Sequence, residues 1–269
     1  MAKPIPSGET DRGAHAEAGA SVPRQSAVHR RYLELASIAA SRFSGTLAGR
    51  LLLSSSFGIR GAELALATTI AGGVFLGIEP DSERLKTAVR NGSCDFMVNT
   101  LDEALRVLKN ELRKRTPLST GLLGDAADIL PAMVVRGVQP DLVAPAPDTG
   151  YRSSLDTLSE RGAHILPPPN TETPAPEEVS WTAATPHDRR QLDRLALDLL
   201  PPEDTVRRRW LEQAPGIFHR QRPPERVLDL NPTERAFFLD RLRAAPLEAA
   251  ATLRWKDLAG VEQTVELSA

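Results

Sequence analysis

The sequence contains one cysteine, Cys94, and few aromatic residues, which make up 4% of its 269 residues. One cysteine excludes an intrachain disulfide, and with it a secreted scaffold held together by disulfides. The scarcity of aromatics predicts a core built from Leu, Ala, Val and Ile. The five histidines are scattered and never fall at the spacing of metal ligands, so we predict no metal site.

An excess of charge of one sign is also missing, as is a long apolar run. The formal net charge is −2, which disfavours nucleic acid or an anionic membrane surface as the main partner. The N-terminal residues lack the apolar segment of a secretory signal. The longest uncharged apolar stretch, residues 64–78, is interrupted by Thr68 and Thr69 and falls short of a membrane span. We therefore expect a cytoplasmic protein.

Composition divides the chain into four parts. Residues 1–28 are rich in small and charged residues, which predicts a disordered tail. Residues 29–167 alternate strand and helix patterns, and residues 168–186 form a proline-rich linker. Residues 187–269 contain three helical patterns and a terminal hairpin. We predict an α/β fold, with a Rossmann-like, doubly wound, mostly parallel sheet and a small C-terminal helical segment with a hairpin.

The stretch SSSFGIRGAE, residues 54–63, follows an apolar run and opens an alanine-rich helix. In a doubly wound fold, the first such turn places backbone N–H groups and the positive end of a helix near a pyrophosphate. Gly58 and Gly61 would let a phosphate approach the backbone. Glu79 follows Gly61 by 18 residues, about the spacing of an acid that binds ribose. A glycine pair also serves tight packing, so both interpretations stay open.

A second candidate turn is GDAAD, residues 124–128, again at a strand end that opens a helix. Gly124 and Asp125 are candidate cofactor-binding residues for the same reason. The alternative is that Asp125 caps the helix by accepting hydrogen bonds from its free backbone amides. An acid at this position would also repel a phosphate.

Two longer stretches carry a resemblance to a known family. LLGDAADILPAMVVRGVQPDLV, residues 122–143, resembles GLVGNAADVxPELVxRGVxPDxV of the urocanate hydratase family. ATTIAGGVFLGIEPDSERL, from residue 67, is similar to that family's ATMAGAxFLxVEVDxxRI. The similarity extends over roughly residues 29–245. It implies a Rossmann-like domain that holds NAD+, which the family uses as an electrophile when it adds water to urocanate.

The glycine turn departs from the family pattern. Where the family has GGMGGMGGAQP, this chain has SSFGIRGAELA from residue 55, which keeps Gly58 and Gly61. Four family glycines are replaced, by Ser55, Ser56, Ile59 and Ala62. Side chains therefore occupy a turn that in the family presents bare backbone.

The reactive motifs of the family are missing as well. Its TDQTSAHDP is replaced by APAPDTG from Ala144, within which Asp148 is a candidate remnant, and its active-site cysteine falls on Leu228. Hydration of a conjugated acid needs an electrophile, a proton donor and a fixed substrate carboxylate. We therefore predict no catalytic residue, and a pseudoenzyme of this family with weakened or residual NAD binding.

Two other hypotheses stay open. An active NAD-dependent hydro-lyase acting on urocanate or a related imidazole acid would use Asp125, Asp128 or Asp148, and turnover of urocanate would identify it. A non-catalytic scaffold would bind a catalytic paralogue or a second copy of the chain through its tail, linker and C-terminal helices. Co-purification would identify that role.

Overall fold

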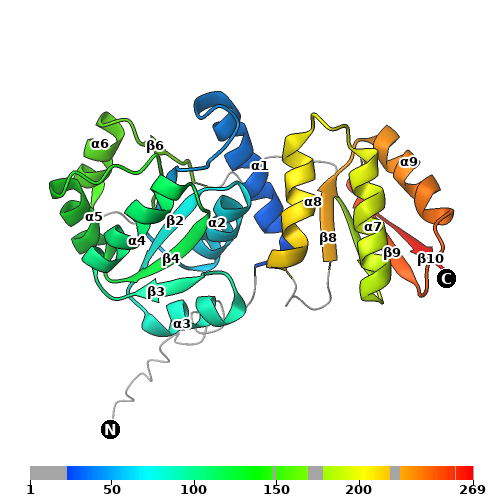
Figure 1. Ribbon diagram of the computed structural model, residues 1–269, viewed down its shortest axis with the longest axis horizontal. Coiled ribbons are helices and arrows are strands. Elements are labelled where there is room, and N and C mark those ends of the chain that lie inside the picture. The colour runs from blue at the N-terminus through cyan, green and yellow to red at the C-terminus, as the bar shows by residue number, and fades with distance from the viewer. Residues whose placement is uncertain (1–22, 148–149, 169–177, 219–224, 258, 269) are drawn as a thin grey trace, which may run out of the picture.

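The computed structural model describes residues 23–147, 150–168, 178–218, 225–257 and 259–268. Two sheets lie side by side, each with helices against it, and α1 and α8 lie between them (Figure 1). Within the described ranges, none of the helices combines the length and the apolar character that a membrane span requires.

The first sheet has six strands in the order β3-β4-β2-β1-β5-β6, and every pair is parallel. Its strands are β1 (Leu51–Ser54), β2 (Val74–Glu79), β3 (Phe96–Val98), β4 (Leu118–Leu123), β5 (Leu142–Ala144) and β6 (His164–Ile165). Strands β1 and β2 are buried along their whole length because helices cover both faces. The prediction of a Rossmann-like parallel sheet is confirmed.

Alternate residues of the central strands face two different helical layers. Leu52 and Phe75 face a core formed with α1, α2 and α3, whereas Leu53 and Leu76 face a core formed with α4, α5 and α6. These helices are α1 (Gln25–Arg42), α2 (Ile59–Ile70), α3 (Ser82–Asn91), α4 (Leu101–Lys114), α5 (Ala126–Val135) and α6 (Arg152–Glu160). Up to Ser54 and Glu79 at their ends, β1 and β2 therefore contain no polar side chain and do not alternate.

The second sheet is antiparallel, with four strands in the order β10-β9-β7-β8. Its strands are β7 (Glu178–Ala183), β8 (Glu225–Asp229), β9 (Ala251–Lys256) and β10 (Glu262–Leu267), and its helices are α7 (Pro186–Leu199), α8 (Thr205–Ile217) and α9 (Pro232–Arg243). The expected terminal hairpin is β9 with β10. It is one edge of a larger sheet because β7 pairs with β9, and β8 was not expected from the sequence.

The predicted linker over residues 168–186 is corrected by β7. Residues 169–177 lie outside the described part of the chain, but residues 178–183 form a strand that pairs on both sides. Val179, Trp181 and Ala183 alternate with less buried residues, the period of a strand with one face on a core. Prolines before and after this segment favoured the prediction of a linker, so the alternation was not recognised in the sequence.

The boundary of the predicted tail, residues 1–28, is also corrected. Residues 1–22 lie outside the described part of the chain, and α1 already begins at Gln25. Val28 is fully buried, so the end of the expected tail is part of the core.

Helix α1 joins the two sheets into one continuous core. Tyr32 of α1 is buried in a cluster that also contains Trp210 of α8 and Leu228 of β8. The ring of His29 lies 4.6 Å from the ring of Trp210, measured between centroids. Burial lowers the pKa of His29 to about 3, so this histidine is a neutral packing residue.

Glu178 and Asp229 lie opposite each other on β7 and β8. Burial, together with the charge of Asp229, raises the pKa of Glu178 from 4.5 to about 7. The carboxyl group of Glu178 therefore binds its proton more tightly in the folded protein than in the unfolded chain. Its contribution to stability is present below about pH 4.5 and is lost as the pH rises to about 7.

The substitution Glu178→Gln, which stays uncharged at every pH, is therefore expected to raise the melting temperature at about pH 8 and to change it little near pH 4.5. Thermal melts at both pH values measure this. Glu262→Gln, on the exposed edge strand β10, is the control and should leave both melts unchanged. An equal shift of the Glu178→Gln melt at both pH values would contradict the assignment.

Candidate functional site

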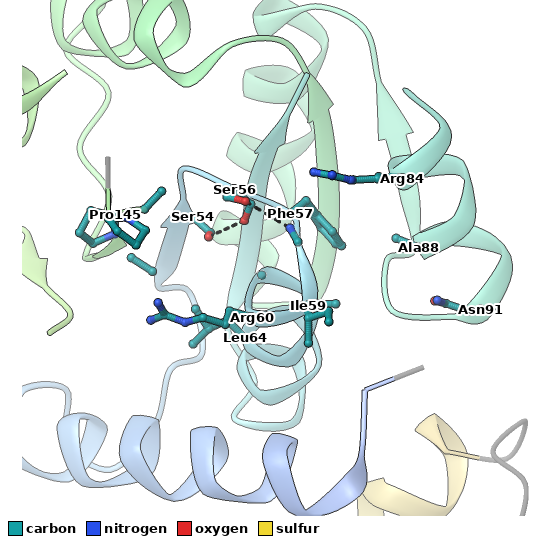
Figure 2. Close-up of a pocket in the computed structure, with 16 residues that line it drawn as sticks. Ser54, Ser56, Phe57, Ile59, Arg60, Leu64, Arg84, Ala88, Asn91 and Pro145 are labelled. Atoms are coloured by element: carbon teal, nitrogen blue, oxygen red, sulfur yellow. Dashed lines mark hydrogen bonds between the residues drawn. The ribbon is translucent and has the colours of Figure 1, made fainter. Parts of the chain in front are cut away.

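A cavity of about 300 Å³ lies at the carboxyl ends of β1 and β5. The chain leaves β1 toward β2 on one side and later returns to β5 on the other, and ligands of open α/β sheets bind where the strand order reverses in this way. Three segments line the cavity: residues between Ser54 and Leu64, the α3 residues Arg84, Ala88 and Asn91, and residues 144–147 after β5 (Figure 2).

Helix α2 begins at this cavity, directly after Gly58. Among the described residues, no side chain caps its N-terminus. The amide of Gly58 donates to Oγ of Ser56 at 3.3 Å. The amides of the first turn and the positive end of the helix dipole therefore favour an anion at this end of the cavity.

Among the described residues, two arginines and no acid line the cavity. Arg60 extends from the first turn of α2 toward the side of Pro145, and Arg84 extends from α3 toward Phe57 (Figure 2). Burial lowers the pKa of Arg60, and the charge of Arg31 lowers it further. The buried Nε of Arg60 has no hydrogen-bond partner in the described part of the chain. A bound anion would offset both unfavourable effects.

Glu79 lies at the end of β2, as predicted, but its carboxylate supports the turn. Oε2 accepts the amide of Phe57 at 3.3 Å. Oε1 accepts the amide of Asp81 at 3.3 Å and the guanidinium of Arg84 at 3.4 Å. Glu79 is 1% exposed and does not line the cavity. A ribose hydroxyl would have to displace these donors to reach it.

Gly58 and Gly61 both line the cavity, but the structure needs them for different reasons. A Cβ at Gly61 would lie 2.3 Å from the backbone oxygen of Ser56, so only glycine lets α2 pack against the turn. A Cβ at Gly58 would have Oγ of Ser56 as its nearest neighbour, at 3.6 Å. Gly58 has φ −62°, a value open to any residue.

The substitution Gly61→Ala is therefore expected to lower the free energy of unfolding by about 1–3 kcal/mol, because the methyl group overlaps backbone. Gly58→Ala should change it by less than about 0.5 kcal/mol, while it places a methyl group beside the candidate anion site. Urea unfolding of both variants makes the comparison. Equal losses of stability would contradict the division of roles.

Gly124 and Asp125 lie at the end of β4 and do not line the cavity. The amide of Gly124 donates to the backbone oxygen of Glu79 at 3.1 Å. Asp125 is exposed, and its Oδ1 accepts the amide of Ala127 at 2.8 Å. This hydrogen bond is the helix cap that the sequence offered as the alternative role. Asp128 is also exposed, and Asp148 lies outside the described residues.

Neither the residue at the family's cysteine position nor Cys94 lines the cavity. Leu228 is fully buried on β8 of the second sheet. Burial raises the pKa of the Cys94 thiol to about 12, which keeps it protonated and unreactive. Among the described residues, no three His, Cys, Asp or Glu side chains gather to hold a metal.

The two arginines of the cavity were not predicted from the sequence. Arg60 stands where the family motif GGMGGMGG has its second methionine. A cation in the glycine turn was therefore visible in the sequence. Arg84 follows Glu79 by five residues on the next helix. Its place in the cavity depends on how α3 packs against the sheet.

The substitution Glu79→Gln is expected to lower the free energy of unfolding by about 1–3 kcal/mol, because Arg84 and two backbone amides lose a charged acceptor. Urea unfolding at neutral pH measures this. Glu83→Gln, an exposed residue of the same helical turn as Arg84, is the control and should have little effect. Unchanged stability combined with lost NAD+ binding would instead assign Glu79 to the ligand.

The chain matches a known family over the part that contains this cavity. Residues 24–149 match the family model of the urocanase Rossmann-like domain. The match runs from α1 to just beyond β5, so it includes all three segments that line the cavity, whereas the antiparallel sheet lies outside it. Over residues 24–149 the chain is therefore similar to the urocanase Rossmann-like domain.

Proposed function

We propose that this protein binds NAD, or a part of NAD, in the cavity beside α2 and does not hydrate urocanate. The proposal rests on the cavity, which combines the uncapped N-terminus of α2 with Arg60 and Arg84 and has no acid among the described residues of its lining. Helix amides and arginines are the groups that bind phosphate most readily in proteins. Arg60 and the first turn of α2 would hold phosphates, and Arg84 would lie toward the nucleoside.

The lining of the cavity supports binding without hydration. Ala144, Pro145, Ala146 and Pro147 stand where the family has its polar segment. A hydratase must supply a proton donor and fix a substrate carboxylate. The described lining offers arginines for the second task but no titratable acid for the first.

The geometry does not support two of the three acids that the hydro-lyase hypothesis names, and the third, Asp148, lies outside the described residues. Asp125 and Asp128 are exposed and lie outside the cavity lining. An exposed carboxylate has no environment that would tune it for acid or base catalysis. Binding of a paralogue or a second copy, and a cytoplasmic location, stay predictions.

Isothermal titration with NAD+ and an absorbance assay of urocanate test the proposal. The wild-type protein is expected to bind NAD+ and to leave urocanate unchanged in its presence. Arg60→Ala and Arg84→Ala should each weaken NAD+ binding by about tenfold, since a hydrogen bond to a charged group contributes about 1.5–3 kcal/mol.

Lys86→Ala is the matched control, because Lys86 lies on α3 and carries the same charge but does not line the cavity. It should bind NAD+ like the wild type. Turnover of urocanate would overturn the pseudoenzyme assignment, and the absence of heat at millimolar NAD+ would overturn nucleotide binding.

A further inference from the structure

Ser55, the first residue after β1, ties the ends of β1 and β5 together. Its amide donates to the backbone oxygen of Ala144 at 3.1 Å. Its hydroxyl oxygen accepts the amide of Ala146 at 2.7 Å and the hydroxyl of Tyr151 at 2.6 Å. Ser55 and Tyr151 are 6% and 5% exposed, so little water competes for these bonds. The ends of β1 and β5 are therefore in direct contact.

Residues 144–147 divide the space at this edge of the sheet. The cavity of about 300 Å³ lies toward α2 and α3, and a second cavity of about 340 Å³ lies toward α6. Arg60 and the segment Pro145–Pro147 line both. Pro145 and Pro147 have no amide hydrogen, so they offer no donor to a phosphate or a carboxamide.

A dinucleotide at such a site lies across the point where the strand order reverses, with one nucleotide on each side. Here it would have to cross the segment that Ser55 holds against β1. Each cavity is at the lower end of the roughly 300–1,000 Å³ range of small-molecule sites. Neither cavity alone has room to spare for two nucleotides.

We infer that the cavity beside α2 binds a single nucleoside diphosphate and excludes the nicotinamide half of NAD. The phosphates lie at Arg60 and the first turn of α2, and the nucleoside lies toward Arg84 and Asn91. This inference rests on the proposed function and narrows its ligand class to mononucleotides. The probe is ADP, which is the half of NAD that would lie on the α2 side of the strand reversal.

The family motif GGMGGMGG does not provide the hydroxyl on which these bonds depend. Ser55 replaces a glycine of the family motif quoted above, and a glycine has no hydroxyl to accept the bonds from Ala146 and Tyr151. Ser56 replaces the next glycine, but its side chain accepts the amide of Gly58 within the same turn. The two neighbouring serines therefore provide a matched pair of variants.

Isothermal titration of the full-length protein with ADP, NAD+ and nicotinamide mononucleotide tests the inference. In the wild type, the dissociation constants of ADP and NAD+ should agree within about threefold, and nicotinamide mononucleotide should give no heat. Ser55→Gly removes the two bonds to the hydroxyl and keeps the amide bond to Ala144, so the segment after β5 is released and NAD+ should then bind about tenfold more tightly than ADP. Ser56→Gly should keep the wild-type ratio.

The outcomes distinguish a failure of this inference from a failure of the proposed function. If NAD+ binds the wild type about tenfold more tightly than ADP, the inference is overturned and nucleotide binding stands. If neither ligand gives heat, nucleotide binding fails and the inference fails with it. An unchanged ratio in folded Ser55→Gly would overturn the role of the tie. If that variant does not fold, the wild-type ratio decides.

Discussion

The end of β1 is hydrogen-bonded to the strands on both of its sides, and the candidate site depends on this arrangement. Glu79 of β2 accepts the amide of Phe57, and Ser55 binds the segment that follows β5. The ring of Phe57 packs over Gly77, where any Cβ would lie 2.3 Å from it. The turn is therefore held by buried contacts, and Arg60 and the start of α2 follow it directly.

These contacts change how the turn can bind an anion. The family's glycine-rich motif presents bare backbone, whereas this chain fills the turn with serines and Phe57 and adds a cation at Arg60. In the proposed site, part of the attraction for phosphate would then come from a guanidinium instead of backbone amides alone. A cavity whose described lining has two arginines and no acid favours anions.

The antiparallel sheet supports this site from a distance. Helix α2 presents its N-terminus to the cavity, and at its other end the guanidinium of Arg209 from α8 donates to the backbone oxygen of Ile70 at 2.6 Å. A cation at the C-terminus of a helix interacts favourably with the helix dipole. Because α1, α2 and α8 share one core, the Rossmann-like domain and the C-terminal part form one packed unit.

Over residues 29–167, local patterns in the sequence determined the order of strands and helices, the parallel sheet and the position of the turn at Gly58 and Gly61, because burial period and turn chemistry depend on near neighbours. Only the tertiary structure decided which partners the side chains meet. Ser55 bonds to Tyr151, 96 residues away, and the carboxylate of Glu79 faces Phe57, 22 residues earlier, and not the cavity. Strand β7 is likewise defined by its pairing with β8 and β9. Such contacts depend on how distant segments pack, which periodicity along the chain does not encode.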